Sequence, residues 1–136
     1  MIDGWKVAVA VRHDLAPWQA LNVTAFVVSG LGTAEPGVIG KDYVDGSGRS
    51  YPPMIGLPIR VFAGDGPALR RAFDRATGRD LLVSVYIDEL FATMDDEANR
   101  AAVAAVPTAE LELSGFAVAG PARQIDKALD RLTLHP

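Results

Sequence analysis

The chain has 136 residues, 49% of them hydrophobic and 22% charged, which excludes an intrinsically disordered chain and fits one domain spanning residues 1–136. Its 13 Lys and Arg residues are scattered among 17 Asp and Glu residues, so the net charge of −4 disfavours a nucleic-acid partner. There is no cysteine, no apolar run long enough to cross a bilayer and no secretory leader pattern, so we expect a cytoplasmic protein without a membrane partner.

Strand and helix patterns alternate along the chain. A nearly continuous apolar run predicts a buried strand at Val7–Val11. Pro17 suits the first turn of a helix over Trp18–Leu31, because a proline at this position loses no hydrogen bond. Helical spacing predicts a buried face made of Leu21, Ala25, Val28 and Leu31. The Asp45-Gly46 pair and Gly48 predict a hairpin turn.

The remaining segments continue this alternation. The hairpin would pair Tyr43-Val44 with Ser50-Tyr51. After it we expect a strand at Ile59–Ala63, a helix at Ala68–Ala76 capped by Asp65, and a strand at Leu81–Ile87. The last three elements are a helix from Asp95 to about Pro107, a strand at Leu111–Ala119 and a helix from Pro121 that buries Ile125, Leu129 and Leu132. Strands separated by helices predict a three-layer α/β/α sandwich with a mixed, mainly parallel sheet.

Polar residues follow the first predicted strand directly, at Arg12, His13 and Asp14. In open α/β sheets, ligands bind outside the carboxyl ends of the strands, so this is where we expect the site. Arg12 would either pair with a carboxylate or hold an anionic ligand. Asp14 would either bind loop N–H groups or act as an acid–base catalyst. His13 would either titrate near neutral pH in the site or lie at the surface.

The start of the first helix adds further candidate ligand-binding residues. Trp18 would either close the core or stack on a ligand. Gln19 and Asn22 lie three residues apart, on one side of the helix, and are the leading polar ligand contacts. The alternative for both amides is bonding to the backbone.

A second polar cluster follows the third long strand. Asp88 and Glu89 are candidates for the same sheet edge, Asp88 as a ligand contact and Glu89 as an acid–base group. The run Asp95-Asp96-Glu97 suits a helix N-terminus better than a calcium loop, because it lacks the central glycine of such loops. We expect neither a metal nor a cofactor, and a solvated His135 near the end of the chain.

Several sequence segments carry a family resemblance. The segments Val9–Leu15 (VAVRHDL) and Gly115–Pro121 (GFAVAGP), the latter followed by Ile125-Asp126-Lys127, resemble the type II peptidyl-tRNA hydrolases. The segment Asp14–Phe26 (DLAPWQALNVTAF), together with DELFAT and DEANR further on, more closely resembles the bacterial family called domain of unknown function two thousand. The resemblance implies a fold of the hydrolase type and a homodimer.

The hydrolase resemblance does not extend to the catalytic helix. The family's Lys, Gln and His positions fall here at Leu21, Ala25 and Val28, none of which can move a proton or bind phosphate. Asp14 and Arg12 keep the family's pattern, and Gln19 could take a displaced position. We therefore expect no peptidyl-tRNA hydrolysis.

Three functions remain open. The first is a module that binds a small molecule or a partner through Arg12, Asp14, Trp18, Gln19, Asn22 and Asp88. The second is an enzyme that uses Asp14 or Glu89 for acid–base chemistry. The third is a structural homo-oligomer, a dimer, that associates through the first helix or the hairpin.

Overall fold

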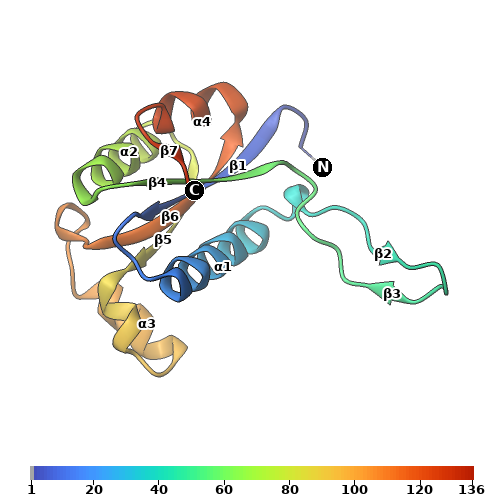
Figure 1. The fold of residues 1–136 in the computed structure, drawn as a ribbon, viewed down its shortest axis with the longest axis horizontal. Helices are drawn as coiled ribbons and strands as arrows, with labels where there is room; N and C mark the ends of the chain where they lie inside the picture. The colour runs from blue at the N-terminus through green and yellow to red at the C-terminus, as the bar shows by residue number, and fades with distance from the viewer. Residues whose placement is uncertain (1) are drawn as a thin grey trace.

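The computed structural model describes residues 2–136 and has a mixed α/β fold (Figure 1). Its main elements are β1 (Trp5–Arg12), α1 (Pro17–Ala34), β2 (Tyr43–Val44), β3 (Ser50–Tyr51), β4 (Ile59–Gly64), α2 (Gly66–Gly78), β5 (Leu82–Ile87), α3 (Asp96–Ala104), β6 (Leu113–Pro121), α4 (Ala122–Leu129) and β7 (Thr133–Leu134). Three short 3-10 turns join them: η1 (Pro36–Val38), η2 (Asp88–Ala92) and η3 (Thr108–Glu110). Each predicted strand and helix is present.

The central sheet over the described residues has five strands in the order β5-β6-β1-β4-β7. β1 and β4 are parallel, whereas β1–β6, β5–β6 and β4–β7 are antiparallel. The sheet is therefore mixed, but the expectation that it is mainly parallel is wrong. The reason is the connection between β5 and β6, which begins and ends at the same end of the sheet. Where β5 ends and β6 begins, the Asp88 N–H donates to the Glu112 carbonyl at 3.0 Å.

Both faces of the sheet are covered, as the apolar run in β1 predicts. Val7, Val9 and Val11 point to one face and pack against α1. Ala8 and Ala10 point to the other face, together with Phe116 of β6. On that second side lie α2 and α4, which contribute Leu69, Ala72, Phe73, Ala76, Ile125, Ala128 and Leu129 to the core. The first face and its helix hold the candidate site described below.

The helix α1 buries a face that overlaps only in part with the predicted one: Leu31 is buried as predicted, and Val28 is half-buried. Val23, Val27 and Leu31 are buried, whereas Leu21 is 72% exposed and Ala25 is exposed. The segment Pro17–Ala34 carries no charged side chain, so apolar residues lie all around the helix and their spacing cannot select the buried side. Packing against the sheet makes that choice, and it leaves apolar side chains outside.

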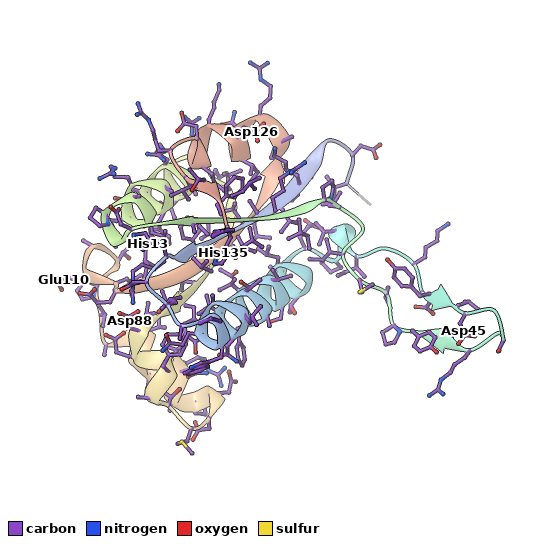
Figure 2. The ribbon with its side chains drawn as sticks, viewed as in Figure 1. His13, Asp45, Asp88, Glu110, Asp126 and His135 are labelled. Atoms are coloured by element: carbon purple, nitrogen blue, oxygen red, sulfur yellow. The ribbon has the colours of Figure 1, made fainter. Side chains whose placement is uncertain are left out.

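Two local predictions are confirmed and one strand was missed. The Asp65 and Asp95 carboxylates cap α2 and α3 by accepting hydrogen bonds from Ala68 N–H and Ala98 N–H, each at 2.8 Å. The hairpin β2–β3 forms an arm that projects from the body, with Asp45 in the arm (Figures 1 and 2). The missed strand is β7, whose two residues exist as a strand only through their pairing with β4.

Candidate functional site

Arg12 joins three chain segments at the end of the sheet. Its Nε donates to Asp14 Oδ1 at 2.6 Å, and its Nη1 donates to Asp88 Oδ1 at 2.9 Å. Nη1 also donates to the Leu113 carbonyl at 3.1 Å, and the Ser114 hydroxyl donates to Asp88 Oδ1. We call Arg12, Asp14, Asp88 and Ser114 the Arg12 clasp. The expected placement of Asp88 beside the end of β1 is thus present.

The chain around Ser114 explains how the Arg12 clasp forms. β5 and β6 pair Tyr86 with Gly115 and then Ile87 with Leu113, so the pairing register shifts across Ser114. Such a bulge re-aims a side chain out of the regular alternation. Ser114 is completely buried, and its hydroxyl is satisfied by Asp88.

The charges of the Arg12 clasp stabilise one another. Burial alone would lower the pKa of Arg12, but hydrogen bonds to Asp88 and Asp14 outweigh it and raise that pKa above its ordinary value. The hydrogen bond from Arg12 in turn lowers the pKa of Asp14. Asp14 is therefore ionised at neutral pH and poorly matched to acid–base catalysis, which works best with a pKa near the working pH. The clasp is an ion-pair network, and Arg12 and Asp88 also line a hollow of about 440 Å³.

A cavity of about 350 Å³ lies beside α1, away from the Arg12 clasp. It opens between α1, the end of β5, the turn η2 and the first turn of α3. We call it the aromatic pocket. Its apolar lining consists of Trp18, Phe26, Tyr86, Leu90, Phe91 and Met94. Its polar lining consists of Asn22, Thr93, Asp95, Asp96 and Asn99.

Four aromatic rings form a continuous row in this pocket. The ring centroids of Trp18 and Phe91 are 5.8 Å apart, those of Phe91 and Tyr86 are 4.9 Å apart, and those of Tyr86 and Phe26 are 6.1 Å apart. The first and last members are unusually open to solvent, because Trp18 is 61% exposed and Phe26 is 56% exposed. Large apolar rings that face solvent around a cavity are typical of binding sites.

Polar groups join α1 to the other walls of the pocket. The Tyr86 hydroxyl donates to Asn22 Oδ1 at 3.3 Å, which leaves the NH₂ donors of Asn22 for other partners. Burial raises the pKa of Tyr86, so this hydroxyl keeps its proton at neutral pH. On the opposite wall, the Thr93 hydroxyl donates to the Leu90 carbonyl at 2.9 Å and also contacts the Asn99 side chain.

The structure separates the residues that the sequence placed in one site. Trp18 and Asn22 line the aromatic pocket, whereas Arg12, Asp14 and Asp88 form the Arg12 clasp. Gln19 accepts a hydrogen bond from the Ala16 N–H at 2.9 Å and so serves the start of α1. Glu89 is exposed on η2 and lines neither feature.

The two histidines share a separate hollow of about 290 Å³ beside Leu21. His13 and His135 both line it, although no sequence pattern connected them (Figure 2). Histidines are common metal ligands, but across residues 2–136 no three His, Cys, Asp or Glu side chains come close enough to hold a metal ion.

Sequence reasoning missed Phe26, Tyr86 and Phe91 as site residues. One signal was available: Trp18, Asn22 and Phe26 are spaced four residues apart and therefore line one side of a helix. Tyr86 and Phe91 come from a distant segment, and only the tertiary fold brings them to that side.

The fold and the pocket together define a mixed α/β protein with a concave, aromatic-lined cavity beside its first helix. The chain belongs to the family described as "Protein of unknown function (DUF2000)", which it matches over residues 5–136. This confirms the closer of the two family resemblances.

A solved structure carries the same fold. It belongs to a protein of unknown function from Agrobacterium tumefaciens strain C58, which shares 39% sequence identity and a TM-score of 0.93. The match covers 99% of this chain and 100% of the other. A search of curated proteins found no match. Along residues 2–136, no helix is both long and apolar enough to cross a membrane.

Proposed function

We propose that the chain is a module that binds a small molecule in the aromatic pocket. The observation that carries this proposal is the row of four rings around a cavity of about 350 Å³, two of them more than half exposed. A cavity of this size, lined by apolar rings and a few converging polar groups, has the make-up of a ligand site. Asn22 and Asn99 supply the polar groups that would orient the ligand.

The binding test compares two exposed apolar residues of the same helix. Native mass spectrometry of freshly purified protein, compared with its denatured mass, should reveal an added mass in the wild type. Trp18→Ala should lose this mass, because Trp18 is a wall of the pocket. Leu21→Ala should keep it, because Leu21 is 72% exposed on the same helix but does not line the pocket. A mass retained undiminished by Trp18→Ala would contradict the proposal.

The proposed function includes a classification of the fold. We propose a three-layer α/β/α sandwich of one domain, related to the type II peptidyl-tRNA hydrolases without their activity. Its support is the packing of α1 on one sheet face and of α2 and α4 on the other, together with the hydrolase-like segments at Val9–Leu15 and Gly115–Pro121. A cytoplasmic location is part of the same proposal, supported by the absence of cysteine from the sequence.

A second candidate function is a structural homodimer, and the projecting arm supports it. Residues 41–54 are exposed throughout, including Tyr43, Val44, Tyr51 and Met54. Asp45 holds the tip in shape by accepting hydrogen bonds from Ser47 N–H, Arg49 N–H and the Tyr51 hydroxyl. An isolated two-stranded hairpin is only marginally stable in water. An arm with several exposed apolar side chains would therefore be stabilised by another protein surface that packs against it. We propose a second copy of the chain, whose uncharged α1 offers an apolar outer face.

Sedimentation equilibrium of two arm variants tests the dimer. Val44→Lys should convert a dimeric wild type to a monomer, because it places a charge among the apolar residues of the arm. Ser47→Lys adds the same charge in the polar turn and should leave the dimer intact. A wild type that is already monomeric would exclude this function.

A further inference from the structure

We propose that the aromatic pocket binds a small organic cation, with a quaternary or tertiary ammonium group held among the rings of Trp18, Tyr86 and Phe91 beside Asp95. This inference rests on the proposed binding function and names the class of its ligand. It follows from the angles between the rings, the charges around them and the carboxylates at the N-terminus of α3.

The rings of Trp18, Phe91 and Tyr86 pack against one another at steep angles. The interplanar angle is 76° between Trp18 and Phe91 and 50° between Phe91 and Tyr86. Their centroids are only 5.8 and 4.9 Å apart, so the rings touch each other and leave no parallel pair between which a flat aromatic ligand could insert. A rounded ammonium group needs no such slot and can lie against the ring surfaces that line the pocket, as cations do within about 6 Å of a ring centroid.

The charges around the pocket favour a cation over an anion. Within residues 2–136, neither lysine nor arginine is among the lining residues, whereas Asp95 and Asp96 both are. Arg100 binds Asp96 and Glu97 from outside the pocket, while Asp95 belongs to none of the salt bridges in the described part of the chain. Within the described residues, no Lys or Arg side chain therefore pairs with the Asp95 carboxylate, which lines the pocket together with the rings.

The N-terminus of α3 would ordinarily attract an anion, because its free N–H groups carry partial positive charge. Here Asp95 already accepts from the Ala98 N–H at 2.8 Å. Asp96 and Glu97 add two more carboxylates in the first turn. An anionic ligand would thus meet like charges. A cation would instead be attracted by Asp95, whose Oδ1 accepts the capping hydrogen bond and whose Oδ2 takes no part in it.

The probes for the test are choline and 3,3-dimethylbutan-1-ol, which replaces the ammonium nitrogen with carbon and so keeps the shape without the charge. Binding is followed by calorimetry and by the fluorescence of Trp18 in a Trp5→Phe background, where Trp18 is the remaining tryptophan. Choline should bind at least about tenfold more tightly than its neutral isostere, the size expected when a cation contacts more than one ring.

Two variants assign this preference to the pocket. Phe91→Leu keeps an apolar wall but removes a ring face, and should weaken choline binding about tenfold with little effect on the isostere. Asp95→Asn removes the charge but keeps a good helix cap, and should weaken choline binding about threefold. Asp65→Asn is the matched control, because Asp65 caps α2 in the same way outside the pocket. It should change nothing.

Two results would overturn the cation proposal. Equal affinities for choline and the isostere would mean a pocket that binds neutral ligands, and the proposed binding function would stand without this ligand class. No choline binding tighter than about 10 mM, together with a neutral or anionic mass retained by the native protein, would also reject the cation. Failure of the binding function itself is distinct, since it appears as the absence of any effect of Trp18→Ala on retained mass.

Discussion

Gly115→Ala is expected to lower the free energy of unfolding by about 3 kcal/mol, the upper end of the usual cost of overpacking. An added Cβ would lie 2.7 Å from the Ala10 carbonyl oxygen and 2.7 Å from Val23 Cγ1. The first is backbone of the neighbouring strand β1 and the second belongs to α1. Neither can move without separating β6 from β1 or α1 from the sheet.

The same substitution should disturb the aromatic pocket. Gly115 pairs with Tyr86 across the sheet, and Val23 is the neighbour of Asn22. A displaced α1 would lengthen the Tyr86–Asn22 hydrogen bond and shift the fluorescence of Trp18. Gly78→Ala is the control, because an added Cβ there meets nothing within 4 Å. It should be neutral or stabilise the chain by up to about 1 kcal/mol, since alanine restricts the unfolded chain. Urea unfolding of the two variants measures both values, and a Gly115→Ala protein as stable as the wild type would contradict this packing.

Arg12→Ala is expected to lower the free energy of unfolding by about 2 kcal/mol. Removing one partner of a buried ion pair costs about 3–5 kcal/mol, and partial exposure reduces that cost. The Arg12 side chain is 19% exposed and that of Asp88 is 39% exposed. The loss follows because Asp88 and the Leu113 carbonyl would lose the hydrogen bonds that Arg12 donates to them.

The control for Arg12 is Arg60→Ala, a change at an exposed position of the neighbouring strand β4 that should stay within about 0.5 kcal/mol of the wild type. Urea midpoints at neutral pH measure both variants. Unchanged stability of Arg12→Ala, combined with loss of an anionic ligand, would mean that Arg12 holds a ligand rather than the sheet ends. This outcome would place the ligand-binding site at the end of β1.

The local features of this fold could be predicted because short-range chemistry determines them. Asp65 and Asp95 are good caps wherever a helix begins, and the Asp45-Gly46 turn needs no distant partner. Strand direction depended on long-range geometry. The segment that contains the short helix α3 brings the chain back to the end of the sheet where β5 stops, so β6 runs antiparallel to β5. The strand β7 has no pattern of its own beyond two residues.

The candidate site was predictable in part for the same reason. Arg12 and Asp88 were expected at one sheet edge, and they meet there. The sequence could not decide whether their charges serve a ligand or each other, because that depends on a distance between two distant segments. Trp18 and Asn22 were both named from the sequence, and the structure places them on one surface. That surface lies beside Tyr86 and Phe91 rather than above Arg12, because the side of α1 that packs on the sheet is the one with Val23 and Val27.

The central claim is that the aromatic pocket is the ligand site, and side-chain NMR signals test it most directly. The indole N–H of Trp18 and the amide NH₂ groups of Asn22 and Asn99 each give a separate signal. Addition of the ligand recovered from the native protein, or of choline, should shift these three signals while the Gln19 amide stays in place. Shifts confined to Gln19 and the Arg12 guanidinium, with Trp18 and Asn99 unmoved, would contradict the account and place binding at the end of β1.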